Sequence, residues 1–313
     1  MTPVVGITLV FTRKCNASCR HCGFSCSPAA SETMTVEQAV RYLREAKESV
    51  PDLQAVSITG GEPLLFAGRV TRVMAFAQQS GLWTELVSNS YWAISRERAH
   101  QRLEGLCRLG LRNFVTSLDS YHAEFVPVER VRFAVECAVD LGLHVTVKTF
   151  RPAPSETEDA WLAECRETKP NLKVIATEPL LVGRAAGSIT LDGRPATAEA
   201  SQGRCDSVIR FPAIHPNGDF YACCGFGAGA RLVGSLKDKP LGALIGELRR
   251  NLLFNLLAES GPAALWEELQ KHGGVPRERS FLGACEVCNA FYFEEGPRRA
   301  LIDLLSRLQS ATA

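Results

Sequence analysis

Apolar and polar positions alternate in blocks along the first three-fifths of the chain. Short apolar runs rich in β-branched residues predict strands, and the longer segments between them repeat their apolar positions with the helical period. A strand about every 30 residues with a helix between is typical of βαβ units around a parallel sheet. Six such units are two fewer than a closed eight-stranded barrel needs, so we predict an α/β fold built as an open, partial (β/α)6 TIM-like barrel. The predicted strands are Val4–Phe11, Leu53–Thr59, Trp83–Ser88, Asn113–Leu118, Leu143–Thr149 and Leu172–Glu178.

The pattern changes after the predicted barrel. Ile209–Ile214 and Phe220–Cys223 have the composition of strands, and Pro216-Asn217-Gly218-Asp219 between them is typical of a hairpin turn. Helical periodicity then returns around a last pair of cysteines. We therefore predict two domains, the partial barrel over residues 1–187 and a small hairpin-and-helix domain over residues 188–313. The predicted helices are Thr35–Ser49, Arg69–Ser80, Arg96–Leu109 and Val131–Leu141 in the barrel, and Leu241–Leu257, Ala263–Lys271 and Pro297–Gln309 beyond it.

Composition and charge exclude several classes of function. The 313 residues are 46% hydrophobic and 22% charged, which are ordinary values for a globular protein. A formal net charge of +1 produces no field that would attract nucleic acid or an anionic membrane, and no apolar run approaches the ~20 residues that span a bilayer. Met1–Ile7 lacks the basic segment and cleavage site of a signal peptide. We therefore expect a cytoplasmic protein with no nucleic-acid or membrane partner.

Twelve cysteines are many for such a protein. A reducing compartment does not keep disulfides, and seven of the twelve fall into closely spaced groups, which indicates metal binding. Cys107, Cys137 and Cys165 lie in predominantly helical segments, where we expect them to pack as small apolar residues.

The first group is Cys15-Asn16-Ala17-Ser18-Cys19-Arg20-His21-Cys22, a C-x3-C-x2-C run directly after the first predicted strand. Iron–sulfur clusters are held by thiolates, and a [4Fe–4S] cluster normally takes four of them. Three ligands leave one iron open to a substrate or cofactor, and the loop after a barrel strand lies at the catalytic face. The alternative is a zinc site in which Cys26 supplies the fourth thiolate; otherwise Cys26 is a spare thiol.

The second predicted strand ends in Ile58-Thr59-Gly60-Gly61-Glu62-Pro63. Together with the cysteine run, this segment resembles the GGEP motif of the radical S-adenosylmethionine (radical SAM) superfamily, which binds the methionyl amino group of S-adenosylmethionine. Glycines at a strand end allow close approach of a ligand, and a carboxylate suits an ammonium group. His21 departs from the family pattern, which usually has an aromatic residue before the third cysteine.

Further polar residues fall at the ends of the later strands. The resemblance implies that they contact the ribose and carboxylate of S-adenosylmethionine, and that the segment Leu181-Val182-Gly183-Arg184 brackets the adenine. The alternative is that they are ordinary helix caps and turn residues. His122, in an expected long loop Ser120–Arg130, could contact substrate or move a proton, or could be a surface histidine. The residues implied in cofactor binding are Gly60, Gly61, Glu62, Pro63, Ser88, Ser117, Asp119, Lys148 and Val182.

The second cysteine group has the pattern C-x12-G-x4-C, followed after a long gap by C-x2-C. It resembles the "twitch" variant of the SPASM domain, which implies one auxiliary [4Fe–4S] cluster; the alternative is a four-cysteine zinc site. Cys224 adjoins one of these cysteines and could donate a hydrogen atom to a substrate radical, or be a buried small residue. The implied ligands are Cys205, Cys223 at the hairpin, and Cys285 and Cys288 in a distant loop.

The resemblance implies a radical SAM enzyme of oxidoreductase or epimerase type. Such an enzyme cleaves S-adenosylmethionine reductively to a 5′-deoxyadenosyl radical, which abstracts a hydrogen atom from the substrate. An electron donor such as flavodoxin or ferredoxin is required. We expect a ribosomally synthesised peptide as substrate, with cross-linking or epimerisation as the outcome. The cluster motif begins at Cys15, so we expect no leader-binding domain ahead of it. The alternatives are a dehydrogenase or epimerase of aminoglycoside- or sugar-type small molecules and, in another class, a non-catalytic metal-binding module.

Overall fold

The computed structural model describes residues 2–150, 156–177, 179–189, 203–223, 232–279, 281 and 283–312. Over these residues the chain forms a nine-stranded sheet in the order β6-β5-β4-β3-β2-β1-β7-β8-β9. Every pair from β6 to β7 is parallel, and β8 and β9 complete the sheet in antiparallel fashion. The strands are β1 (Gly6–Thr12), β2 (Ala55–Gly60), β3 (Trp83–Val87), β4 (Leu111–Ser117), β5 (His144–Phe150), β6 (Leu172–Thr177), β7 (Ala213–Ile214), β8 (Asp219–Tyr221) and β9 (Leu232–Ser235).

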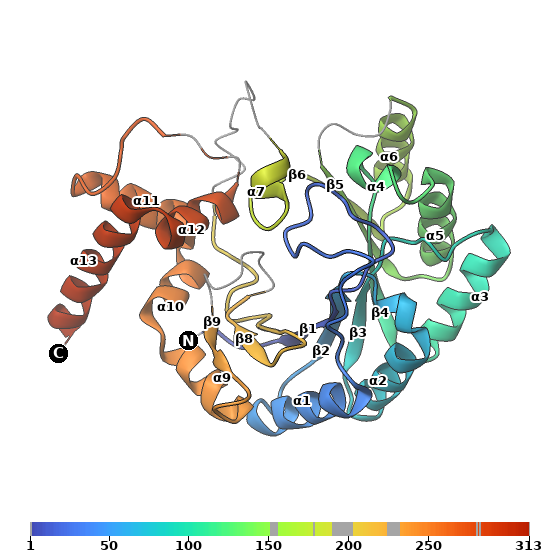
Figure 1. The fold of residues 1–313 in the computed structure, drawn as a ribbon, viewed down its shortest axis with the longest axis horizontal. Helices are drawn as coiled ribbons and strands as arrows, with labels where there is room; N and C mark the ends of the chain where they lie inside the picture. The colour runs from blue at the N-terminus through green and yellow to red at the C-terminus, as the bar shows by residue number, and fades with distance from the viewer. Residues whose placement is uncertain are drawn as a thin grey trace.

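The sheet is curved and open, and helices line its convex side (Figure 1). The predicted partial barrel is therefore confirmed. None of the helices in the described part of the chain is both long and apolar enough to cross a membrane. The helices are α1 (Val36–Ser49), η1 (Pro63–Phe66), α2 (Ala67–Gln79), α3 (Arg96–Cys107), α4 (Ser120–Ala123), α5 (Val128–Asp140), α6 (Glu156–Thr168), α7 (Ala185–Ser188), α9 (Leu241–Arg250), α10 (Leu252–Glu259), α11 (Gly261–Lys271), α12 (Ala284–Phe293) and α13 (Glu295–Thr312).

The first helix shows how local sequence sets these elements. Thr35 caps α1, because its hydroxyl accepts the N–H of Gln38 at 3.1 Å while the Gln38 side chain accepts the N–H of Thr35 at 2.9 Å. Such a capping box satisfies donors that a helix start otherwise leaves open. Leu43 and Ala46 follow on the buried face of α1, so the helix begins directly after its cap and packs on the sheet.

The predicted hairpin is present, but it extends the barrel sheet. Ala213 and Ile214 of β7 pair with Thr8 and Leu9 of β1 in parallel register, while β7 and β8 form the antiparallel hairpin. The prediction that the first hairpin strand starts at Ile209 is wrong, because Ile209 has a left-handed backbone with φ of 66°, which strand geometry forbids.

Three other expectations for the C-terminal part are corrected. The helix predicted over Leu241–Leu257 is two helices, because Asn251 leaves the helical conformation and its side chain caps α10 through the N–H of Phe254. Strand β9 was missed, since its four residues carry little apolar periodicity. The distant loop expected around Cys285 and Cys288 is the first half of helix α12.

Strand β1 has two different faces. Ile7, Leu9 and Phe11 are fully buried in the main apolar core. Val10 points to the other side, where it packs in a separate small cluster that includes Cys15. Since side chains alternate along a strand, β1 joins the helix-covered core to the cysteine loop that follows it.

We expect Leu9→Ala to reduce the free energy of unfolding by about 2–5 kcal/mol, because it opens a cavity in a fully buried central strand. Leu232→Ala in β9 is the matched control, since Leu232 is 45% exposed and should lose less than about 1 kcal/mol. Urea unfolding followed by circular dichroism measures both. Equal losses would contradict the central position of β1.

Candidate active site

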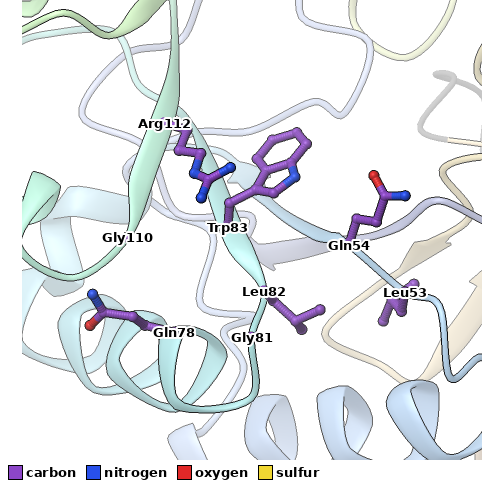
Figure 2. A pocket seen from close by; sticks show the side chains of 8 residues that line it. All are labelled: Leu53, Gln54, Gln78, Gly81, Leu82, Trp83, Gly110 and Arg112. Carbon is purple, nitrogen blue, oxygen red and sulfur yellow. The ribbon is translucent and has the colours of Figure 1, made fainter.

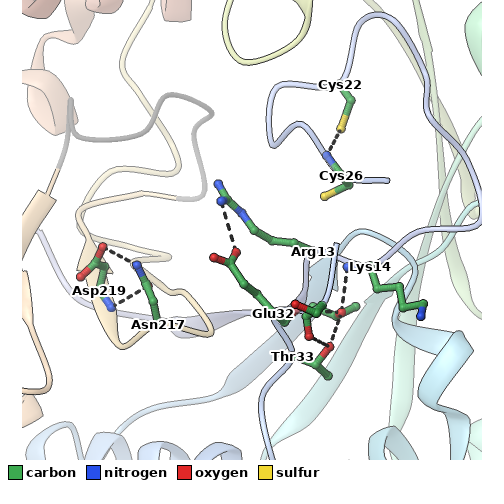
Figure 3. Close-up of polar contacts among 10 residues, drawn as sticks. Arg13, Lys14, Cys22, Cys26, Glu32, Thr33, Asn217 and Asp219 are labelled. Carbon is green, nitrogen blue, oxygen red and sulfur yellow. Dashed lines mark hydrogen bonds and ion pairs between the residues drawn. The ribbon is translucent and has the colours of Figure 1, made fainter. Parts of the chain in front are cut away.

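The loop after β1 carries the first cysteine group. Cys15 and Cys19 are buried and Cys22 is half-buried. The loop closes on itself, because the Cys15 N–H donates to the carbonyl of Ser27 at 3.0 Å. Inside it, the Cys26 N–H donates to the Cys22 sulfur at 3.4 Å (Figure 3). The three cysteines thus lie on one closed loop at the carboxyl end of β1.

The electrostatics of these thiols indicate what the loop can hold. Burial raises the pKa of Cys15 to about 11 and that of Cys19 to about 12. A hydrogen bond from the Cys26 side chain is the main reason why the pKa of Cys22 is lowered to about 6. Buried thiols become thiolates when metal ions supply positive charge beside them, so the donor set fits an iron–sulfur cluster.

The cysteine sulfurs do not form a compact group. Among the described residues, no three cysteine sulfurs lie within 4.8 Å of one another. The preference for an iron–sulfur cluster over the zinc alternative therefore rests on the sequence motif.

The glycines at the end of β2 lie against the cysteine loop. A Cβ on Gly60 would come within 2.2 Å of the Thr12 carbonyl oxygen, and one on Gly61 within 2.2 Å of the Lys14 carbonyl oxygen. Gly60 also has φ of 133°, a region that side chains disfavour. The N–H of Glu62 donates to the same Lys14 oxygen at 2.9 Å. We expected these glycines to let a ligand come close, but the backbone of Thr12 and Lys14 occupies that space.

Glu62 is fully buried at the start of η1, next to the buried Pro63. Its carboxylate accepts the N–H of Leu64 at 2.9 Å, the N–H of Asn89 at 2.8 Å and the Ser88 hydroxyl at 3.0 Å. Burial raises the pKa of Glu62 to about 7, and these donors oppose the rise. The carboxylate that we expected to face an ammonium group thus ties η1 to the end of β3.

Asn89 continues this network to the cysteine loop, although we had not placed it among the site residues. Its side-chain amide donates to the Asn16 side chain at 2.9 Å and lies 3.8 Å from the Cys15 sulfur. The sequence signal for Asn89 is its position beside Ser88 at a strand end, where we predicted only the serine as a site residue.

A second polar group lies on the other side of the loop. Asp119 is fully buried and caps α4, accepting the N–H groups of Tyr121 and His122 at 3.0 Å each. Its second oxygen lies 2.8 Å from Nδ1 of His122. The expected long loop Ser120–Arg130 is wrong, because this cap starts α4 and Pro127 precedes α5.

His21 belongs to the same group. Its ring centroid lies 4.6 Å from that of His122 and 4.6 Å from that of Phe150, so the imidazole fills the place of the aromatic residue usual in this motif. Burial lowers the pKa of His21 to about 4, which keeps the ring neutral. Its Nδ1 is buried without a hydrogen-bond partner among the described atoms, and one ligand atom each of His21, Asp119 and His122 lie within 4.8 Å of one another.

The remaining predicted residues flank this region. Half-buried Ser117 and exposed Lys148 are register partners at the ends of β4 and β5. Val182 is buried after β6, and Gly183 and Arg184 behind it contact the cysteine loop directly. The structure thus gathers the predicted residues of all six barrel strands at one rim.

The second cysteine group lies in the C-terminal part of the chain. Cys223 follows β8 and is buried in the main core together with Cys288, while half-buried Cys205 packs against that core. Cys285 is exposed and lies one helical turn before Cys288 on α12. Cys224 lies outside the described residues.

A pocket of about 450 Å³ lies at the opposite end of the barrel (Figure 2). It is formed where β2, β3 and β4 begin, whereas active sites of such barrels are found where strands end. The pocket is therefore separate from the cysteine loop. Its lining residues are Leu53, Gln54, Gln78, Gly81, Leu82, Trp83, Gly110 and Arg112.

Comparison with known proteins agrees with this geometry. The sequence profile of the radical SAM superfamily matches residues 9–164, a span that contains the cysteine loop and the Gly60–Pro63 segment. The chain belongs to the radical SAM superfamily. Membership of this enzyme superfamily implies a [4Fe–4S] cluster and the binding of S-adenosylmethionine, and the donor set described above fits both.

The similarity to individual proteins extends further along the chain. YydG of Bacillus subtilis (strain 168), described as a peptide biosynthesis protein, is 23% identical over 308 residues, which are 91% of each chain. The structure of anSMEcpe with bound AdoMet and the Cp18Cys peptide has a TM-score of 0.57 at 14% identity, covering 98% of this chain and 100% of that one. A histidine-tagged form of anSMEcpe with bound AdoMet has a TM-score of 0.58 at 14% identity, with 96% and 98% coverage. The fold is thus shared beyond the barrel.

The buried Glu62 predicts a pH dependence. Because its folded-state pKa of about 7 lies above the ordinary 4.5, its contribution to stability is present at low pH and is lost as the pH rises through about 7. We expect the stability of the wild type relative to Glu62→Gln to fall by about 1–3 kcal/mol between about pH 5 and about pH 8. Urea unfolding at each pH measures this difference.

Glu48→Gln, on the exposed face of α1, is the matched control and should show no such trend. A difference for Glu62→Gln that grows with pH would show instead that the surrounding donors keep the carboxylate charged at neutral pH.

Proposed function

We propose that this radical SAM enzyme modifies a ribosomally synthesised peptide by cross-linking or epimerisation. The observation that carries the proposal is the full-length similarity to YydG, whose name assigns it to peptide biosynthesis and which matches over 91% of both chains. The shared fold with anSMEcpe, whose structure holds a peptide, supports it at the level of architecture.

Cys15, Cys19 and Cys22 would hold the [4Fe–4S] cluster that binds S-adenosylmethionine. With both groups bound, the chemistry supplied is reductive cleavage to a 5′-deoxyadenosyl radical that abstracts a hydrogen atom from the peptide. An electron donor of the flavodoxin or ferredoxin type would supply the electron. The chain contributes the burial of the thiols, which excludes water, and the three-ligand arrangement.

The rim residues would position the cofactor. Lys148, exposed at the end of β5, suits a carboxylate, and Ser117 beside it offers a hydroxyl. Glu62 would act through Ser88 and Asn89, because its own oxygens already accept their hydrogen bonds. The remaining members of the proposed cofactor site are Gly60, Gly61, Pro63, Asp119 and Val182.

The C-terminal part would hold an auxiliary [4Fe–4S] cluster on Cys205, Cys223, Cys285 and Cys288. We keep the division into a barrel domain, 1–187, and an auxiliary-cluster domain, 188–313, as part of this proposal. Epimerisation requires that a hydrogen atom be returned to the substrate radical, and Cys224 is the candidate donor. His122, held by Asp119 at 2.8 Å, is the candidate for proton movement.

The first test is anaerobic reconstitution. We expect about eight irons per chain, two clusters of four, and 5′-deoxyadenosine formed from S-adenosylmethionine under reduction. Replacing Cys15, Cys19 and Cys22 together by Ala should abolish the nucleoside and leave about four irons. Cys107→Ala in α3 is the matched control and should retain both. Nucleoside formation with only about four irons in the wild type would refute the auxiliary cluster.

The second test concerns the substrate. A short precursor peptide encoded beside the gene is incubated with the reconstituted enzyme and analysed by mass spectrometry. A cross-link lowers the peptide mass, whereas epimerisation leaves it unchanged in water and introduces deuterium in D2O. Nucleoside formation with an unmodified peptide, together with conversion of an aminoglycoside-type sugar, would contradict the peptide assignment.

A further inference from the structure

Arg184 joins the end of β6 to the cysteine loop. Its guanidinium donates from Nη1 to the Cys19 carbonyl at 2.8 Å and from Nη2 to the Cys26 carbonyl at 2.6 Å. Its backbone N–H donates to the Cys22 carbonyl at 3.1 Å. One residue therefore binds three carbonyl groups of a loop that lies more than 150 residues earlier in the chain.

The backbone before Arg184 packs just as closely. A Cβ on Gly183 would lie 2.2 Å from the Gly23 carbonyl oxygen, and Gly183 has φ of 59°. The flanking Val182 and Ala185 are buried. Gly183 thus packs against the loop beside Arg184, and Figure 1 shows α7 beside the loop that follows β1.

The guanidinium of Arg184 forms no ion pair with another described residue. Among the described residues, no carboxylate lies within 4.0 Å of its guanidinium, which is only partly exposed. The charge lies directly against the loop, since the guanidinium donates to the Cys19 and Cys26 carbonyls. A partly buried charge acts on its neighbours with little screening.

We propose that Arg184 is a positioning residue that clamps the cysteine loop around the radical SAM cluster and raises the reduction potential of that cluster. This inference rests on the proposed function only in that Cys15, Cys19 and Cys22 hold the cluster. Reduction adds one electron from the flavodoxin- or ferredoxin-type donor and so one negative charge to the cluster site. A fixed positive charge beside the loop stabilises the reduced state more than the oxidised one.

The test compares Arg184→Gln, Arg184→Lys and the wild type, all reconstituted anaerobically on a background in which Cys205, Cys223, Cys285 and Cys288 are Ala, so that one cluster is observed. Potentiometric titration monitored by electron paramagnetic resonance gives the midpoint potential. For Arg184→Gln we expect the equilibrium constant for reduction to fall about tenfold, or about 59 mV for a one-electron couple. Arg20→Gln, a loop residue paired at the surface with Glu124, is the matched control and should keep the wild-type potential.

The clamp is tested by the rate at which a chelator removes iron. Arg184→Lys keeps the charge but cannot bridge two carbonyls, so we expect a near wild-type potential with faster iron loss. If Arg184→Gln retains no iron, the clamp is tested on Arg184→Lys alone. Iron loss from that variant at the wild-type rate would overturn the clamp. An unchanged potential in Arg184→Gln would overturn the electrostatic role. A wild-type chain without any cluster would refute the proposed function instead.

Discussion

The constraint on which the site depends is close backbone contact between the cysteine loop and the ends of distant strands. The loop packs in a small apolar cluster that it shares with Val10, Ala213 and Tyr221. Gly60 and Gly61 on one side and Gly183 on the other approach its carbonyl oxygens so closely that a Cβ would lie 2.2 Å away. Because no side chain fits at these contacts, the loop is held between β2 and β6 by backbone hydrogen bonds and by Arg184.

Buried polar groups complete this arrangement, and the hydrogen bonds of Glu62 and Asn89 join it to neighbouring elements. Glu62 receives its donors from η1 and the end of β3, and Asn89 passes the network on to Cys15. An unpaired buried charge destabilises the folded state, so the hydrogen bonds of this network form together or not at all. The thiols of Cys15 and Cys19 differ from these groups, because burial raises their pKa values and favours the neutral form. Cluster binding and the ordering of the loop are therefore coupled.

Much of the barrel could be predicted from the sequence, because its strands are apolar on both faces or alternate regularly and its helices carry strong caps such as Thr35. The C-terminal part was predicted less well. Ile209 has strand composition but a left-handed backbone, and Asn251 breaks a continuous apolar helix pattern by capping the next helix. At both positions a local hydrogen bond or packing contact overrides propensity, which a single sequence does not reveal.

The residue types proposed for the site could be recognised without a structure, since the spacing of Cys15, Cys19 and Cys22 and the Gly60–Pro63 segment are local patterns. Which side chains contact one another depends on the fold. Glu62 is directed to Ser88 and Asn89, His21 to Asp119 and His122, and Arg184 to Cys19 and Cys26. These partners are far apart in the sequence and meet because parallel strands end at the same rim, a relation that depends on strand order and register.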